Sequence, residues 1–335
     1  MIRIAFFEIK GWEKRFLRKR LKNISLDFFK EPLSLENTKK VQGYEAVSVF
    51  IYSKVSKEVI SKLPKLKLIT TRSTGFDHID LRECRKRNIL VSNVPFYGEN
   101  TVAEHTFALI LSLSRNVHKS YSRTLRGDFS IEGLKGFDLK GKTLGVIGAG
   151  HIGLHVIRIA KGFGMDVLAF DTRQDKFLAE VLEFEYTAFD KLLQNSDIIT
   201  LHTPYNKFTR HLINKENIRL IKKGAILINT ARGGLIDPEA LIGALNKGIL
   251  RGAGLDVLEG EELIKEEKQL LYDKKKLESL ASLVKGHILL SRDNVVFTPH
   301  IGFYSQEALE RILDVTAKNI LGFLSDRPQN MVNYD

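Results

Sequence analysis

Three glycines are spaced so that they can hold a pyrophosphate. Gly148, Gly150 and Gly153 form the pattern G-x-G-x-x-G between a β-rich run, TLGVI, and a helix-like stretch. In such a turn the first glycine permits a tight bend, the second lets the phosphates approach the backbone, and the third lets the helix pack on the strand. Free N–H groups at the start of the helix then point at the phosphates. The spacing predicts a dinucleotide site, to which His151 and Ile152 also contribute.

An acidic residue completes this pattern. Asp171 ends the next β-rich run, DVLAFD, 18 residues after Gly153. A carboxylate at this point accepts a hydrogen bond from a ribose 2′-hydroxyl and repels a 2′-phosphate, so it favours NAD over NADP, although Arg173 nearby weakens that preference. Strand, glycine turn, helix and acidic residue occur in the order that the dinucleotide pattern requires. We therefore favour NAD binding over a purely structural glycine-rich turn.

Other polar residues stand where further β-rich runs end. DIITLHTP, AILINTAR, GAGLDV and NVVFTPH end at or near His202, Thr203 and Pro204, then Arg232, Asp256 and His300. Each of these alone has the alternative reading of a capped loop residue. Ligands of open α/β sheets bind beyond the carboxyl ends of the strands. We therefore expect an arginine, acidic groups and a histidine to converge on one crevice beside the dinucleotide.

Two other sequence patterns are rejected because the residues around them do not fit the function. Residues Gly136–Thr143 fit the P-loop pattern letter for letter, but a P-loop follows a strand and opens a helix, whereas this loop leads into the strand TLGVI. His151 and His155 have metal-pair spacing on one helix face, without an evident third ligand. The sequence thus argues against nucleotide hydrolysis and predicts no metal site.

The elements that must position these residues alternate along the chain. Short apolar β-rich runs are separated by helix-length amphipathic stretches, which is typical of βαβ units and parallel sheets buried on both faces. One set of runs lies in residues 1–99 and the other in residues 143–300. The fold class is therefore α/β, with two Rossmann-like, doubly wound parallel-sheet domains and a cleft between them.

Two long helices mark the domain boundaries. The first is expected from Asn100 to about Arg123 and begins the second domain, and the other, roughly Ser305–Leu324, returns to the first. We expect a flavodoxin-like substrate domain of residues 1–99 plus 301–335, and an NAD-binding domain of residues 100–300. The charged stretch 262–292 is interpreted as a helical insertion at the rim of the second sheet.

Composition is that of a globular enzyme. The chain has 335 residues, of which 43% are hydrophobic and 27% charged, as in ordinary two-domain proteins. No apolar run reaches the roughly 18 residues of a membrane span, and the first residues do not resemble a signal peptide. The single cysteine, Cys84, cannot form an internal disulfide. These features predict a cytoplasmic protein without a membrane segment.

The net charge of +12 is concentrated at the start of the chain. Residues 1–90 carry 21 basic and 10 acidic side chains, so nearly the whole excess lies there. Such a segment suits nucleic acid, an acidic membrane face or small anionic substrates. The densest part, Glu13–Asn23, has helical spacing with an apolar side, and we interpret it as a solvated helix face. Without interleaved aromatic residues, a nucleic-acid partner is not expected.

Seven segments together resemble the D-isomer-specific 2-hydroxyacid dehydrogenase family. They are GVIGAGHIG, LHTP, NTARGGLID, GLDVLEGE, TPHIGFY, TTRSTGFDHIDL and NVPFYGENTVAEH, and they cover nearly the whole chain. The EGE tripeptide, the tyrosine of TPHIGFY and the long gap between Glu261 and His300 are most similar to the D-lactate dehydrogenase branch, although this step of 39 residues is longer than is usual there. The resemblance implies two Rossmann-like domains with NAD between them, and a homodimer formed through Asn100–Arg123.

The resemblance also implies a catalytic set of Arg232, Glu261 and His300 that reduces a small 2-keto acid to a 2-hydroxy acid. His300 would donate the proton, since imidazole titrates near neutral pH, and Glu261 would orient its ring. The planar guanidinium of Arg232 would grip the substrate carboxylate with two parallel hydrogen bonds.

The remaining implied site residues bind without reacting. Backbone N–H groups of Thr74 and Gly75 would share the substrate carboxylate, and Phe50 or Tyr52, with Tyr97 and Tyr304, would wall the pocket for the substituent. The other residues expected to contact NAD are Thr203, Pro204, Thr209, Thr230, Ala231 and Asp256, the last of these near the nicotinamide.

Alternatives of two kinds remain open at this point. Those within the family are reductases of glyoxylate or hydroxypyruvate, dehydrogenases of bulkier 2-hydroxy acids, and 3-phosphoglycerate dehydrogenase, which commonly carries a further regulatory domain. From another class, some relatives are NAD-sensing corepressors that bind peptides, because a fold by itself does not determine function.

Overall fold

The computed structural model describes residues 2–260 and 277–332, and the side chains of these residues except 277–283. The chain divides into two compact units. The N-terminal unit comprises Met1–Tyr97 and Ser305–Asp335, and the central unit comprises Gly98–Tyr304. None of the described helices has the length and apolar character that crossing a membrane requires.

The N-terminal unit is built on a five-stranded parallel sheet. Its strands are β1 (Arg3–Phe6), β2 (Ser25–Phe28), β3 (Ala46–Val49), β4 (Leu68–Thr71) and β5 (Leu90–Ser92). Their spatial order is β2-β1-β3-β4-β5, and every pairing is parallel. This is the strand order of flavodoxin-like folds, in which ligands bind where the order reverses, here between β1 and β3.

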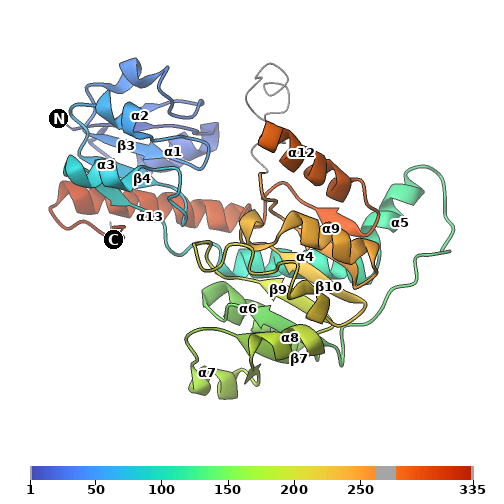
Figure 1. Cartoon of the computed structure of the whole chain (residues 1–335). Helices are drawn as coiled ribbons and strands as arrows, with labels where there is room; N and C mark the ends of the chain where they lie inside the picture. The colour runs from blue at the N-terminus through green and yellow to red at the C-terminus, as the bar shows by residue number, and fades with distance from the viewer. Residues whose placement is uncertain (1, 261–276, 333–335) are drawn as a thin grey trace. The chain divides into compact units, whose positions relative to one another are not determined.

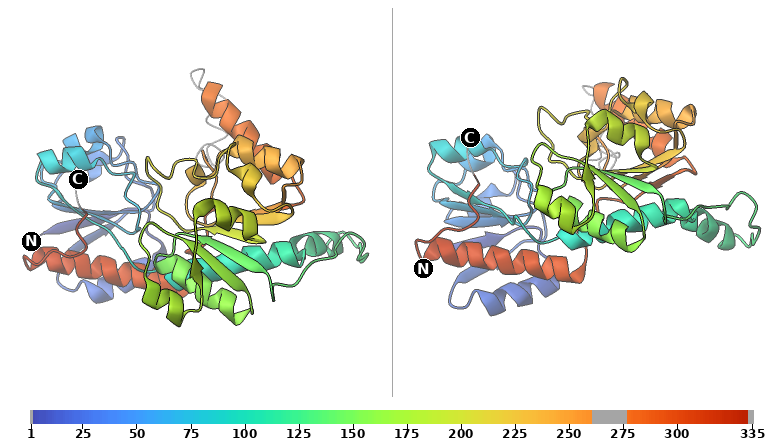
Figure 2. Two further views of the ribbon diagram at one scale, coloured as in Figure 1. Left: turned by 60° about the horizontal axis from the view of Figure 1, so that its bottom comes forward. Right: turned by 90° about the horizontal axis from the view of Figure 1, so that it is seen from below.

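Helices cover both faces of this sheet. On one face α1 (Gly11–Arg20) and α13 (Gln306–Leu324) lie side by side (Figure 2), and they bury Ile4 and Phe6 of β1. The alternate residues of the same segment, Ala5 and Phe7, point to the other face. The single short apolar run of β1 therefore serves two cores.

The second face is covered by α2 (Lys57–Ser61) and α3 (Leu81–Lys86), while the 3-10 turn η1 (Thr38–Val41) adds Val41 to the same core. Cys84 of α3 lies in this core, and burial raises the pKa of its thiol to about 12. The thiol is therefore a packing group here.

The central unit contains a seven-stranded parallel sheet. Its strands are β6 (Thr143–Ile147), β7 (Asp166–Phe170), β8 (Glu185–Tyr186), β9 (Ile198–Leu201), β10 (Ala225–Asn229), β11 (Leu250–Leu255) and β12 (Val295–Phe297). The order is β12-β11-β10-β9-β6-β7-β8, so the direction of winding reverses between β6 and β9. Together the two sheets confirm the predicted α/β class with two doubly wound parallel sheets (Figure 1).

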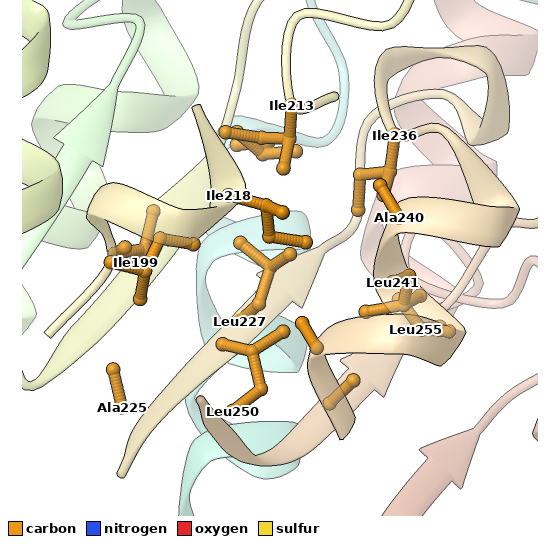
Figure 3. Close-up of a cluster of buried hydrophobic side chains, with 14 of the residues drawn as sticks. Ile199, Ile213, Ile218, Ala225, Leu227, Ile236, Ala240, Leu241, Leu250 and Leu255 are labelled. Atoms are coloured by element: carbon orange, nitrogen blue, oxygen red, sulfur yellow. The ribbon is translucent and has the colours of Figure 1, made fainter. Parts of the chain in front are cut away.

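Two helical layers enclose the central sheet. One consists of α4 (Glu99–Ser114) and α6 (His151–Gly162), which pack on β6, β9 and β10. The other contains α8 (Phe189–Asn195), α9 (Pro238–Asn246) and the 3-10 turn η2 (Ile218–Leu220), and Figure 3 shows Ile218 next to Leu227 in its core. With both faces apolar, polar side chains can gather only at the strand ends.

The expectation of one continuous helix from Asn100 to Arg123 is wrong. Helix α4 ends at Ser114, and a separate helix, α5 (Val117–Thr124), begins after Asn116, whose backbone is left-handed with φ 51°. The Asn116 amide donates to the carbonyl of Leu134 at 3.1 Å, and Phe137 N donates to the Ser114 carbonyl at 2.9 Å. These long-range partners break the helix at a position where the local pattern is still helical.

Three other elements bear on the predictions. Helix α9 begins as expected, because the Asp237 carboxylate accepts from Glu239 N at 2.9 Å and Pro238 occupies the first turn. Part of the charged insertion is the helix α12 (Leu277–Leu290), while residues 261–276 lie outside the described residues. The strands β2 and β8 were not predicted, because they are short edge strands without a continuous apolar run.

We expect the substitution Ile320→Ala to destabilise the protein by about 2–5 kcal/mol, because it opens a cavity between α13 and the sheet. Ile320 is fully buried, whereas its neighbour Leu321 is 44% exposed. The matched control Leu321→Ala should change stability by no more than about 0.5 kcal/mol. Chemical denaturation measures both, and equal effects of the two substitutions would contradict the packing of α13 described here.

Candidate functional site

The glycine turn follows β6 directly and is shaped by close backbone contacts. Gly148 has φ 97°, and a Cβ atom on it would lie 2.8 Å from the carbonyl carbon of His202. A Cβ on Gly153 would lie 2.0 Å from the Gly148 carbonyl oxygen. Around Gly150, which caps α6, no atom lies within 4 Å of such a Cβ. Packing thus requires glycine at positions 148 and 153, whereas a Cβ at Gly150 would face open space.

Asp171 follows β7 and is hydrogen-bonded to the glycine turn. Its Oδ2 accepts from Ala149 N at 2.8 Å, and its Oδ1 accepts from Arg173 N at 2.8 Å. An ionised carboxylate has about four acceptor sites. Both oxygens therefore keep a lone pair that can accept from ribose hydroxyls, and the carboxylate is fixed in place to do so.

The end of β9 carries two buried polar atoms that have no hydrogen-bond partner among the described residues. They are Nε2 of His202 and Oγ1 of Thr203. Burial lowers the pKa of His202 to about 3, so its ring is neutral. Because buried polar atoms in proteins normally find partners, the pair beside Gly148 suits a polar ligand such as a dinucleotide.

The loop after Pro204 is braced by Thr209. Its hydroxyl donates to the Pro204 carbonyl at 2.6 Å and accepts from Asn206 N at 2.9 Å. The hydroxyl of Thr209 therefore shapes the loop rather than pointing freely from it.

Arg232 stands just beyond β10, in a turn that Asn229 holds. The Asn229 side chain accepts from Ala231 N at 3.0 Å and donates to the Arg232 carbonyl at 2.9 Å. Nη1 of Arg232 donates to the Ala231 carbonyl at 2.7 Å, which uses one of the five N–H donors of the guanidinium. The neighbouring Thr230 hydroxyl is 3.0 Å from that of Thr106 in α4.

The turn after Arg232, η3 (Gly233–Leu235), is enclosed by two loops. A Cβ on Gly233 would lie 2.1 Å from the carbonyl carbon of Leu258, and one on Gly234 would lie 2.6 Å from the Tyr205 ring. His211 spans the same region: its N donates to the Gly234 carbonyl at 2.8 Å and its Nε2 lies 2.9 Å from Oε2 of Glu259. Sequence reasoning missed this pair, because its partners lie 48 residues apart.

His300 follows β12 in a left-handed conformation, with φ 57°. Its N donates to the Asp256 carbonyl at 2.9 Å, and its ring meets that of Phe303 edge-on at 6.3 Å. Asp256, at the end of β11, is 1% exposed. Its carboxylate accepts from Ile301 N at 2.9 Å and Gly302 N at 2.8 Å, so it holds the backbone beside His300.

In the N-terminal unit, the loops after β3 and β4 contain several of the residues predicted for the substrate. The Glu8 carboxylate accepts from Phe50 N at 2.8 Å, Tyr52 N at 2.9 Å and Ser53 Oγ at 2.5 Å. Beneath them Arg72, 2% exposed, donates to the Phe7 carbonyl at 2.6 Å. Neither Glu8 nor Arg72 was singled out from the sequence, because a single charged residue beside a strand has no distinctive spacing.

The other predicted substrate residues are held by backbone contacts. The Thr74 hydroxyl donates to the Val94 carbonyl at 2.9 Å, and Gly75 accepts from the Ser73 hydroxyl at 2.6 Å. The Tyr97 carbonyl accepts from Nε of Arg311 at 2.7 Å. Tyr304 belongs to the central unit, where its ring packs edge-on against Phe303.

The structure thus gathers the predicted residues at one edge in each unit. The carboxyl edge of the central sheet carries the glycine turn, Asp171, Arg232, Asp256 and His300, and that of the N-terminal sheet carries the loops of Phe50 and Thr74. Glu261 lies outside the described residues.

Comparison with known proteins agrees with this arrangement. The model of the D-isomer specific 2-hydroxyacid dehydrogenase NAD-binding domain matches residues 107–302. The chain is 36% identical to D-lactate dehydrogenase of Escherichia coli, over 95% of this chain and 96% of that protein. It is also 36% identical to glyoxylate reductase of Thermococcus litoralis, over 88% and 86% of the two chains.

A solved structure extends the likeness to three dimensions. The structure of D-lactate dehydrogenase from Aquifex aeolicus, complexed with NAD and lactic acid, superposes with a TM-score of 0.85 at 39% identity and 98% coverage of both chains. The fold and site define an NAD-dependent oxidoreductase that acts on the CH–OH group of 2-hydroxy acids. The chain belongs to the D-isomer specific 2-hydroxyacid dehydrogenase family.

We expect Gly153→Ala to weaken NADH binding by at least about 10-fold, because the new methyl group would collide with the Gly148 carbonyl and displace the turn; a loss of 1.4 kcal/mol corresponds to that factor. The matched control is Gly162→Ala at the other end of α6, where a Cβ meets nothing within 4 Å. NADH fluorescence titration compares the two variants. Unchanged affinity in Gly153→Ala would argue against the turn as the cofactor site.

Proposed function

We propose that the protein is a D-lactate dehydrogenase, which interconverts pyruvate and D-lactate with NADH and NAD. The observation that carries this proposal is the position of Arg232 and His300 beyond the carboxyl ends of β10 and β12, on the same sheet edge as the glycine turn. A carboxylate-binding cation and a proton-exchanging ring beside a dinucleotide are what the reduction of a 2-keto acid needs.

Arg232 is proposed to bind the substrate carboxylate. Its guanidinium uses one N–H on the Ala231 carbonyl, which fixes its plane. The remaining N–H groups can form two parallel bonds to a carboxylate. The backbone N–H groups of Thr74 and Gly75 are proposed as further donors to the substrate, with Phe50, Tyr52, Tyr97 and Tyr304 around its substituent.

His300 is proposed to donate a proton to the keto oxygen during reduction and to remove it in the reverse direction. Bound NADH supplies the hydride that the keto carbon accepts. The left-handed backbone of His300 is held by Asp256, whose carbonyl accepts from His300 N and whose carboxylate accepts from Ile301 N. Glu261 is proposed, from the family resemblance, to orient this ring and to favour the imidazolium form.

The residues that would hold NAD fit that role. Gly148, Gly150 and Gly153, with His151 and Ile152 at the start of α6, are proposed to bind the pyrophosphate, and Asp171 the adenosine ribose. The remainder of the NAD site is proposed to be lined by Thr203, Pro204, Thr209, Thr230, Ala231 and Asp256.

Glyoxylate reduction is the second candidate, because the chain is as similar to glyoxylate reductases as to D-lactate dehydrogenases. A rate panel separates the two: pyruvate, glyoxylate, hydroxypyruvate and phenylpyruvate, each with NADH and with NADPH. We expect the highest kcat/KM for pyruvate with NADH. A higher value for glyoxylate would replace the proposed substrate, equal use of NADPH would contradict the role of Asp171, and NADH binding without any turnover would favour a cofactor-sensing protein.

Replacement of His300 by alanine should lower kcat by about 10²–10⁴-fold, since general acid catalysis contributes that much. NADH affinity, measured by fluorescence, should stay the same. The control is His155→Ala, which removes a histidine that contacts Arg158 on α6. If His300→Ala keeps wild-type turnover, His300 is not the acid.

Arg232→Lys should raise KM for pyruvate by about 10–100-fold, because lysine keeps the charge but loses the planar pair of hydrogen bonds, worth about 1.5–3 kcal/mol. Arg251→Lys, at an exposed arginine that contacts the Lys135 carbonyl, is the matched control. Steady-state kinetics at saturating NADH measure both. An unchanged KM in Arg232→Lys would rule out carboxylate binding by this side chain.

We further propose that the protein is a homodimer. Helix α5 and the loop after it extend away from the central sheet (Figure 1), and they expose Tyr121, Leu125, Phe129 and Ile131 by 64%, 70%, 80% and 85%. Clusters of exposed apolar side chains are uncommon on monomers and mark contact surfaces. A second copy of the chain is the partner that this surface would bury.

Ile131→Asp should shift the protein from dimer towards monomer in light scattering after gel filtration, because a charge would be buried without a partner. Phe177→Asp, at an apolar residue of α7 (Lys176–Val181) that is 71% exposed, should leave the mass unchanged. A monomeric parent protein, or dissociation by Phe177→Asp alone, would contradict this interface.

A further inference from the structure

His105 connects α4 to the segment that carries His300. Its Nε2 lies 2.9 Å from Oγ1 of Thr298 and 3.3 Å from Oδ1 of Asp256. The Thr298 hydroxyl is in turn 2.6 Å from the same Asp256 oxygen. Thr298 stands two residues before His300. These contacts form one chain of hydrogen bonds that begins on a helix and ends at a carboxylate.

The direction of each bond follows from the number of protons. A threonine hydroxyl has one proton, and an ionised carboxylate can only accept. Thr298 therefore donates to Asp256, and its oxygen accepts from His105. Nε2 of His105 must carry a proton whether the ring is neutral or charged. That proton lies between the Thr298 oxygen at 2.9 Å and the Asp256 Oδ1 at 3.3 Å, so both oxygens share it.

The Asp256 carboxylate is kept ionised in a buried place. Burial is the largest influence and raises its pKa, but hydrogen bonds from His105, Thr298, Gly302 and Ile301 together hold the pKa below its usual value. Among these four donors, only His105 comes from a helix, α4, which packs on the central sheet. Removing it leaves the carboxylate with fewer donors and frees the Thr298 hydroxyl to turn.

Asp256 holds the backbone of His300 and of the two residues that follow it. Its carbonyl accepts from His300 N, its Oδ1 from Ile301 N and its Oδ2 from Gly302 N. A Cβ on Gly302 would lie 2.9 Å from Oδ2 of Asp256 and 3.3 Å from the His105 ring, so a side chain there would have to displace these groups. A residue other than glycine keeps a left-handed backbone, as His300 does, only where contacts with the surrounding structure hold it there.

We propose that His105 is a positioning residue for His300 and acts on it through Thr298 and Asp256. This inference rests on the proposed acid–base role of His300. His105 itself touches neither substrate nor cofactor in this account. It determines how firmly the His300 backbone is held, and therefore how often the ring stands in the orientation from which it can transfer a proton.

The test compares His105→Leu with His105→Gln. Leucine removes the donor, and we expect kcat with pyruvate to fall about 10-fold, the effect of one hydrogen bond, while KM and the NADH dissociation constant stay within about 2-fold. Glutamine restores an N–H donor and should recover most of kcat. His118→Leu is the matched control, because His118 forms ring hydrogen bonds to two carbonyls, of Ser112 and Asp293, away from His300.

A double-mutant cycle shows whether the effect runs through His300. In the His300→Ala background, His105→Leu should cause no further loss of the residual rate, measured in single turnovers. An equal loss in both backgrounds, no loss in either, or parallel loss of NADH binding would overturn the proposal for His105. Wild-type turnover in His300→Ala alone would overturn the acid–base role instead, so the two failures are distinguishable.

Discussion

In a parallel sheet that is covered by helices on both faces, polar side chains can reach a ligand only at the ends of the strands, because burial of unpaired polar groups in the apolar layers is costly. In both sheets of this protein the candidate site residues lie beyond the strand ends. The hydroxyls of Thr70, Ser92 and Thr200 are exceptions inside the strands, since they are buried without a hydrogen-bond partner among the described residues. The interior positions of β9 and β10 are buried throughout, and the functional groups begin one to three residues after the strands end. The same constraint explains why residues as distant in sequence as Gly148 and His300 occupy one edge.

In both units, polar side chains hold the backbone of the candidate site residues in place. Asn229 holds the turn of Arg232, and Asp256 holds the segment of His300. In the N-terminal unit, Glu8 holds Phe50 and Tyr52 in the same way. Pyruvate and glyoxylate differ by one methyl group, and a pocket distinguishes such a difference by only about 1–3 kcal/mol.

Much of this arrangement follows from local sequence. The glycine turn, the strands around it and helix α13 were predictable, since each has a short-range pattern of apolar and turn-forming residues. Asp171, Arg232 and His300 could be singled out because they follow such strands. Other features depend on partners far along the chain. The break at Asn116 is decided by Leu134, the His211–Glu259 contact spans 48 residues, and the anchoring roles of Glu8 and Asp256 appear only when the loops are folded.

The C-terminal helix α13 has a consequence for how the protein is made. The N-terminal unit is discontinuous: its sheet is complete by residue 92, but Ile4, Phe6 and Leu68 pack against Leu313 and Ile320, which are translated some 220 residues later. A growing chain therefore exposes part of one apolar face of its first sheet, beside α1, on the ribosome, whereas the continuous central unit has all its parts before α13 emerges. Loss of the last thirty residues would uncover that part of the face and make the chain prone to aggregation, even though the glycine turn, Arg232 and His300 would all still be present.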